Sequence, residues 1–263
     1  MTTIDMSLLD LVIIYALLAI PLAILLASRI ALVRKAAIAI ARMSVQLALV
    51  GFYLRYIFEL NNVFVNFAWV SVMILVANAN VLGTAGLSLR KLFPVTVVGI
   101  ALSTLAVLAV FVFGAVQPTP LYDARYMIPL TGMILGNCMR GNVISLERFF
   151  SAIARNEKEY TSFIFMGATV REATLPYFRQ ALAAALSPTV TTMATMGIVS
   201  LPGMMTGQIL GGSSPVTAIK YQMAIMVAIF VTVALGAYLN LLLSMRVSFD
   251  RYGMLRREVM KKP

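Results

Sequence analysis

Residues 197–215 read GIVSLPGMMTGQILGGSSP. This stretch contains five glycines and two prolines but no charged residue, and it lies within an uncharged run from Gln180 to Ile219. A long uncharged run is typical of a membrane-spanning helix, whereas glycine and proline interrupt helices. The stretch therefore predicts that a span ends here and that an apolar, non-helical segment follows it.

The composition of the whole chain indicates that its solvent is lipid. Of its 263 residues, 61% are hydrophobic and 12% are charged, whereas soluble domains are about half apolar and about a quarter charged. A single cysteine excludes a disulfide within the chain, and the lack of histidine excludes His-based metal and catalytic sites. We expect no cofactor.

Apolar runs of about 20 residues predict the membrane spans. The N-terminal segment carries Asp5 and Asp10 but no basic residue before the first run, so this run is expected to be a retained span rather than a signal peptide. The chain is predicted to be an all-α integral membrane protein, with a single transmembrane domain over residues 1–263. Its seven expected spans are 8–28, 36–58, 62–83, 93–114, 124–145, 179–201 and 217–244.

The distribution of lysine and arginine predicts the orientation, because cytoplasmic loops are enriched in both. With seven spans, only Arg55, Arg125 and Lys220 of the 21 basic residues fall on one side. The N-terminus is therefore expected outside and the C-terminus in the cytoplasm. This topology, together with anionic lipid headgroups on the cytoplasmic face, accounts for the net charge of +11 without a nucleic-acid partner.

Residues 140–180 form the one sizeable water-soluble segment of the predicted topology, on the cytoplasmic side. Its apolar residues suit an amphipathic helix that continues from the membrane and ends at Gly167. Thr169 and Glu172 have capping-box spacing and predict the start of a second, short helix, which Pro176 stops or passes on to the next span. We expect a helix–Gly–helix element.

Residue types and motifs that are absent from the sequence disfavour several classes of function. They hold no paired carboxylates, and the ten acidic residues lie at span edges or in loops, so neither an intramembrane enzyme nor proton coupling is favoured. The chain contains no P-loop motif for ATP. A permease that docks a separate ATPase fits both observations, and an ion-coupled carrier or a channel without an ATPase is the alternative.

Four blocks resemble the FetB-type permeases, the membrane subunits of putative iron-export ABC transporters, which are related to plant aluminium-tolerance half-transporters. The blocks are RMSVQLALVGFYLRYIF (42–58), IPLTGMILGNCM (128–139), Gly-Ala-Thr (167–169) and TMGIVSLPGMMTGQILGGSSPVTAIKYQM (195–223). The resemblance implies a multi-span permease in the plasma (cell inner) membrane, paired with an ABC-type ATP-binding subunit, with two copies of each. It also implies iron as a cargo.

Two sets of residues are predicted to carry the transport cycle. Coupling to the ATPase is expected at the helix–Gly–helix element. Polar residues in the cytoplasmic half of the spans predict a substrate path, because polar groups in lipid face other helices or water. The alternative role for these polar residues is hydrogen bonding between helices. Likewise, the G-x-x-x-G at Gly132 and Gly136 indicates close helix packing rather than transport. The coupling residues are Glu159, Gly167, Ala168, Thr169 and Glu172, and the path residues are Arg42, Gln46, Asn78, Asn80, Asn137, Cys138 and Thr189.

The opening stretch is expected to form an apolar plug on the exit side, with Pro202, Gly203, Met204 and Met205 as an outer gate. The 17 methionines are mostly expected to fill gaps in the core, and only Met204 with Met205, and Met133 with Cys138, are candidate metal groupings. The spans offer no histidine or carboxylate for iron(II). A chelated metal, an anion or a small metabolite therefore stay open as cargo, and the metal ligands are unknown.

Overall fold

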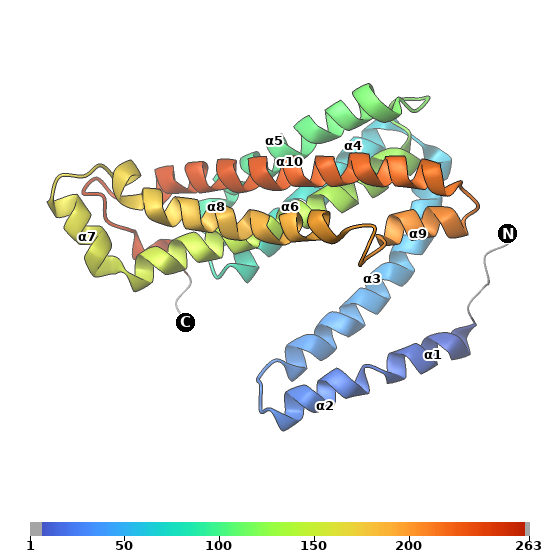
Figure 1. The fold of residues 1–263 in the computed structure, drawn as a ribbon, viewed down its shortest axis with the longest axis horizontal. Helices are drawn as coiled ribbons and strands as arrows, with labels where there is room; N and C mark the ends of the chain where they lie inside the picture. Colours follow the sequence, from blue (N-terminus) through green and yellow to red (C-terminus); the bar gives the residue numbers. More distant parts are fainter. Residues whose placement is uncertain (1–6, 261–263) are drawn as a thin grey trace.

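The computed structural model describes residues 7–260 and is all helical over that range, with three isolated β-bridges and no strand. Asp5, Lys261 and Lys262, which entered the predicted charge distribution, lie outside the described residues. The all-α prediction is confirmed. The long helices run side by side as a bundle, from which the N-terminal hairpin swings away (Figure 1).

Within residues 7–260, five helical segments are long and apolar enough to cross a membrane, and each corresponds to a predicted span. The first is split by a turn at Leu17–Leu18 into two helices, and the fourth ends in a π-helical segment. In chain order the elements are α1 (Leu8–Ala16), α2 (Ala19–Ala27), α3 (Val33–Leu60), α4 (Val63–Thr84), α5 (Leu89–Ala109) with η1 (Val110–Val116), and α10 (Pro215–Ser248).

The predicted spans at 124–145 and 179–201 correspond to two long but less apolar helices, α6 (Ala124–Arg155) and α8 (Val170–Thr195). The expected end of the second at residue 201 is wrong, because α8 stops at Thr195. Met196 is extended and Gly197 has a positive φ of 85°, a conformation that glycine adopts without strain. The number of spans and the side on which each terminus lies stay predictions.

Side-chain caps set where several helices begin. Asn62 accepts a hydrogen bond from the Phe64 N–H, and Asp123 accepts one from the Arg125 N–H. Ser214 caps α10, in which Pro215 occupies the first turn, where its missing N–H breaks no helical bond. These caps fix the loops between the long helices of the bundle.

The segment between α6 and α8 departs from the helix–Gly–helix prediction in two ways. The first helix ends at Asn156, its C-cap residue, whose backbone N–H and side-chain N–H both donate to the Ala152 carbonyl. A separate helix α7 (Glu157–Phe165) follows. The second helix is not short, because α8 continues through Pro176 and Pro188. Buried residues on either side of Pro176, Ala173 and Tyr177, hold the helix against the core despite the missing hydrogen bond.

The predicted non-helical plug contains a short helix, α9 (Gly203–Leu210), for which Pro202 is the N-cap residue. The chain from Met196 to Pro202 is irregular, as expected, but the residues after Pro202 are helical up to the Gly211–Gly212 turn. Proline is pre-organised for a helix start and glycine for its end. Pro202 and the Gly211–Gly212 turn therefore delimit α9.

The core of the bundle is formed by α4, α5, α6, α8 and α10, and its largest fully buried side chains are aromatic. Phe149 and Phe150 of α6 meet edge to face, and Tyr160 of α7 packs on Phe249. The N-terminal hairpin joins this body only near the end of α3, where Ile57 packs with Ala124 and Ile128 in a second, small cluster. The rest of α1, α2 and α3 leaves its apolar side chains exposed.

Candidate functional site

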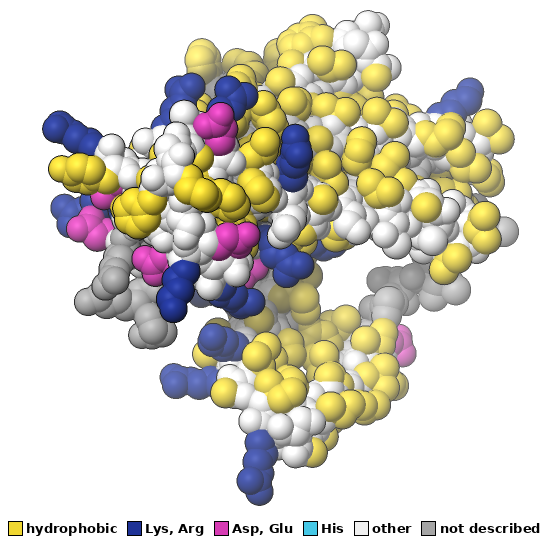
Figure 2. Space-filling model, turned by 60° about the vertical axis from the view of Figure 1, so that its left-hand side comes forward, with side chains coloured by type: hydrophobic (Ala, Val, Ile, Leu, Met, Phe, Trp, Pro, Cys, Tyr) yellow, Lys and Arg dark blue, Asp and Glu magenta, His cyan; other side chains and the backbone are white. Residues whose placement is uncertain are grey.

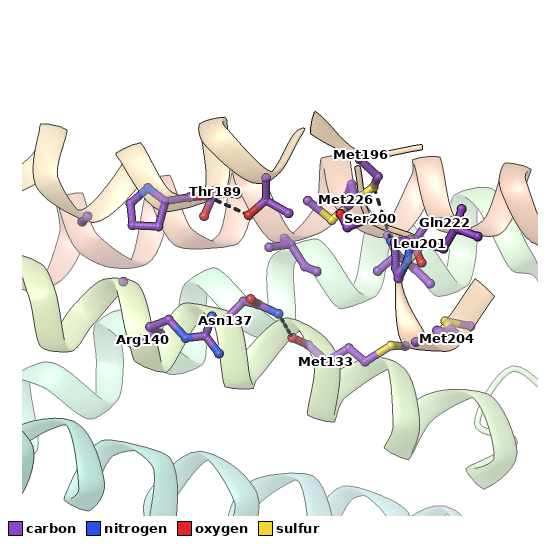
Figure 3. Close-up of a pocket in the computed structure, with 18 of the residues that line it drawn as sticks. Met133, Asn137, Arg140, Thr189, Met196, Ser200, Leu201, Met204, Gln222 and Met226 are labelled. Carbon is purple, nitrogen blue, oxygen red and sulfur yellow. Dashed lines mark hydrogen bonds between the residues drawn. The ribbon is translucent and has the colours of Figure 1, made fainter. Parts of the chain in front are cut away.

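A cavity of about 320 Å³ lies between α6, α8, α9 and α10. The irregular segment 196–202 and the first residues of α9 close one side of it (Figure 3). Arg140 is the only charged residue among the lining side chains, and no acidic residue is among them. The cavity is thus a mainly apolar chamber with a few polar groups, as is typical of small-ligand sites.

The cationic group and the thioether groups of the cavity lie toward different ends. In Figure 3, Arg140 and Asn137 of α6 and Thr189 of α8 lie at one end, and Met133, Met204 and Gln222 lie at the other. The Asn137 amide N–H donates to the Met133 carbonyl at 2.9 Å, so its oxygen is left for other donors. A ligand here would meet a cationic, polar end and a thioether-rich end.

Of the predicted path residues, the structure brings Asn137 and Thr189 together on this cavity. Arg42 and Gln46 are exposed on α3, in the part of that helix that stands apart from the bundle. Asn78 is buried and donates to the Phe93 carbonyl at 3.0 Å, which ties α4 to α5. Asn80 is exposed and accepts from Thr84. These four residues lie away from the cavity.

Cys138 belongs to a buried polar seam between α5, α6 and α10, not to the cavity lining. Its sulfur lies 3.2 Å from the Asn142 amide nitrogen and 3.8 Å from the Ser103 hydroxyl. Asn142 in turn accepts a 2.6 Å hydrogen bond from the Asn240 side chain. The seam joins three helices by groups that lipid cannot solvate.

Three of the four predicted gate residues line the cavity. Pro202, Gly203 and Met204 line the cavity, whereas Met205 does not. Three further lining groups were missed: Met196, Ser200 and Met226. Gln222 was missed as well, although a glutamine within the apolar run of 217–244 was a signal that could have found it.

The predicted coupling residues gather around the turn between α7 and α8. Gly167 has a φ of 92°, which a residue with a side chain adopts only under strain. The Thr169–Glu172 capping box is confirmed: the Glu172 carboxylate accepts from the Thr169 N–H at 2.8 Å and from its hydroxyl at 2.7 Å. These hydrogen bonds from Thr169 hold the pKa of Glu172 below its usual value.

Two contacts brace this turn against its surroundings. Glu159 of α7 accepts a 3.1 Å hydrogen bond from the Tyr177 hydroxyl of α8, and Ala168 packs partly buried against the core. The tip itself is apolar and open, since Phe165 is 80% exposed and Met166 is 73% exposed. Exposed large apolar side chains that lie together mark protein–protein or membrane contacts.

The family-model comparison matches residues 8–249 to the model described as "Uncharacterised protein family (UPF0014)". The chain belongs to the UPF0014 family. With its apolar helices, this UPF0014 chain is a multi-pass membrane protein. The expected family resemblance is confirmed.

Curated relatives of this UPF0014 chain include bacterial and plant proteins. It is 37% identical to a UPF0014 membrane protein of Synechocystis sp., over 73% of this chain and 74% of the relative. It is 32% identical to the protein ALUMINUM SENSITIVE 3 of Arabidopsis thaliana, over 71% of this chain and 67% of the relative. It is 29% identical to the probable iron export permease protein FetB of Escherichia coli, over 85% of each chain. No solved structure gives a significant match.

Proposed function

We propose that this chain is the membrane-spanning permease subunit of an ABC transporter, which exports a metal or another small solute from the cytoplasm by alternating access. The relative named as a probable iron export permease supports the direction and the class of function. In this proposal the chain itself is not an enzyme. ATP is hydrolysed by a separate ATP-binding subunit, and a second copy of the chain completes the transporter.

The observation that carries the proposal is the continuity between the cavity and the α7 turn. The two helices that form facing walls of the cavity, α6 and α8, are the same helices that flank α7. A force on the turn is transmitted along helices, which are stiff, to the residues that line the chamber. Closure of two ATPase subunits would thereby open and close the cavity.

The α7–α8 turn is the proposed docking element for the ATPase. Phe165 and Met166 would insert into an apolar groove of the partner, and the capping box would keep the turn rigid. Figure 2 shows most of the charged side chains in view gathered at the end of the bundle that carries α7. Such an end suits the aqueous side of a membrane better than its hydrocarbon.

Co-purification from native membranes tests this assignment. The wild-type chain is expected to retain, in a mild detergent, a stoichiometric partner that contains a P-loop motif and hydrolyses ATP. Phe165→Asp places a charge in the apolar contact, and Gly167→Arg adds strain to the turn, so each should release the partner. Leu121→Asp, in the exposed loop before α6 at the other end of the bundle, is the matched control and should retain it.

A wild-type chain that transports solute in purified form without such a partner would instead indicate an ion-coupled carrier or a channel. Equal retention of the ATPase by Phe165→Asp and Leu121→Asp would contradict the docking assignment while leaving the permease function in place. The two outcomes are therefore separable.

A further inference from the structure

Four methionines from four separate segments line the same cavity. They are Met133 of α6, Met196 after α8, Met204 of α9 and Met226 of α10. In the view of Figure 3, the Met133 side chain extends toward Met204, and Met196 and Met226 lie close to Ser200 and Gln222. The fold thus collects thioether groups that lie up to 93 positions apart in the chain (133 to 226).

Gln222 places a second kind of donor atom at the thioether end. The residue is only 7% exposed, and its side-chain nitrogen lies 3.9 Å from the Met196 sulfur as a hydrogen-bond donor. Its side-chain oxygen has no hydrogen-bond partner among the described residues. A buried amide oxygen without a donor costs roughly 1–3 kcal/mol in folding, so a ligand that this oxygen contacts would offset that cost.

The donor set discriminates between classes of cation. Hard divalent cations prefer carboxylate and water oxygens, and iron(II) prefers nitrogen and oxygen ligands. The cavity lining contains no carboxylate, the chain contains no histidine, and the described residues contain no cluster of His, Cys, Asp or Glu suited to a metal. Thioethers are soft donors that select Cu(I) and similar ions.

The charge at the cavity discriminates between cations of different valence. Arg140 lines the polar end and has no salt bridge within the described residues. Coulomb repulsion is proportional to charge, so Arg140 opposes the entry of a monovalent cation half as strongly as that of a divalent one. Desolvation in a mainly apolar chamber also costs less for the monovalent ion.

We propose that the thioether end of this cavity binds a soft monovalent metal cation of the Cu(I) class, held by Met133, Met196, Met204 and Met226 with the Gln222 amide oxygen. The proposal rests on the proposed transport function of the cavity and specifies its cargo. The methionines in this cavity act as ligands, whereas those elsewhere in the core fill space.

Binding of Ag(I) to the purified full-length chain, without ATP or a partner, tests the proposal. Silver is a redox-stable probe for Cu(I), and equilibrium dialysis with elemental analysis gives the stoichiometry. The wild-type chain is expected to bind one ion at the cavity. Met133→Leu and Met204→Leu keep the volume of the side chain and should each weaken binding tenfold or more.

Three controls separate this site from other soft groups. Met139→Leu and Met245→Leu change methionines that pack on the core without lining the cavity and should bind Ag(I) as the wild type does. Cys138→Ala removes the only thiol, which is buried outside the cavity, and should also leave binding unchanged. X-ray absorption of the Cu(I)-loaded wild-type chain should show a sulfur shell, a readout that needs no variant.

Absence of Ag(I) binding by the folded wild-type chain, or binding that survives replacement of all four cavity methionines by leucine, would overturn the proposal. An absorption spectrum with only nitrogen and oxygen neighbours would overturn it independently. Each result leaves the association with an ATPase untouched, because that association is measured by co-purification. Loss of the ATPase association would in turn leave the binding result intact.

Discussion

At the level of single residues, glycines decide how closely the helices of the core approach. A side chain added at Gly99 of α5 would fall on the Asn240 side-chain oxygen, and one at Gly236 of α10 would lie 2.7 Å from the Cys138 sulfur. Small residues that let helix backbones approach, with polar groups as bridges, are the usual way that helices pack in lipid. The seam of Asn240, Asn142 and Cys138 depends on these glycines.

Replacement of Gly99 by alanine is expected to lower the thermal stability of the purified chain. The new methyl group collides with the fully buried Asn240 side chain, and overpacking of this kind costs about 1–3 kcal/mol. Gly136→Ala is the matched control, because nothing lies within 4 Å of its added side chain. The melting temperatures of the two variants in detergent are compared by fluorescence-detected size-exclusion chromatography after heating. Equal melting temperatures would contradict the overpacking at Gly99.

Protonation of Glu172 is expected to loosen the start of α8. Because the hydrogen bonds from Thr169 lower its pKa in the fold, the ionised carboxylate stabilises the turn above its ordinary pKa of 4.5. That contribution is lost as the pH falls through the lower, folded value. The protection of residues 167–172 against hydrogen exchange, relative to the intrinsic exchange rate at each pH, should therefore fall as the pH is lowered below 4.5. Glu172→Gln should remove the pH dependence, and an unchanged profile in that variant would argue against the capping box as its cause.

At the level of elements, the C-terminal tail is tied to the α7 end of the bundle. The buried Tyr160 hydroxyl donates to the Gly253 carbonyl at 2.6 Å, and Lys91 at the start of α5 lies 2.6 Å from the Glu258 carboxylate. Burial first, and the nearby Asp250 carboxylate second, raise the pKa of Tyr160 to about 12. The hydroxyl therefore stays protonated and keeps its donor role throughout the physiological range.

Tyr160→Phe is expected to free the tail. It leaves the Gly253 carbonyl without its donor, at a cost of about 1–3 kcal/mol, and trypsin should cleave after Arg251 and Arg256 faster than in the wild type. Tyr252→Phe, at a side chain that is 81% exposed, is the control and should cleave at the wild-type rate. Indistinguishable cleavage of the two variants would show that the hydrogen bond does not hold the tail.

Sequence reasoning succeeded where the signal is local. The Thr169–Glu172 spacing predicted a real cap, and the apolar runs predicted the long helices, because both depend on neighbours along the chain. It failed at Asn156, where the helix breaks, and in the expected shortness of the helix that begins at Val170, because tertiary packing decides whether a helix breaks or continues. The G-x-x-x-G at Gly132 and Gly136 predicted a close approach, but an added side chain at Gly136 would meet nothing within 4 Å, and one at Gly132 would only contact the Met73 side chain at 3.5 Å. The four-methionine cavity unites distant segments and has no local signal.

At the level of the whole molecule, the docking turn and the cavity segment lie toward opposite ends of the same bundle. Figure 1 shows α7 at one end and α9 near the other, with α6, α8 and α10 running between them. The polar seam and the aromatic core make α5, α6 and α10 a stiff unit. Segment 196–202 lacks such support, and Ile198 and Val199 are 91% and 79% exposed. Movement is therefore expected at this segment.

ATP hydrolysis by a partner is expected to change access to the cavity from the outer side. Ser200→Cys tests it most directly, because Ser200 lines the cavity and the native Cys138 is buried. Ser213→Cys, in the exposed turn before α10, is the matched control. In the complex with its ATPase, a membrane-impermeant maleimide is added from outside, with and without ATP and vanadate. Labelling at position 200 is expected to change several-fold on trapping, while position 213 stays equally labelled. Equal labelling at position 200 in both states would contradict it.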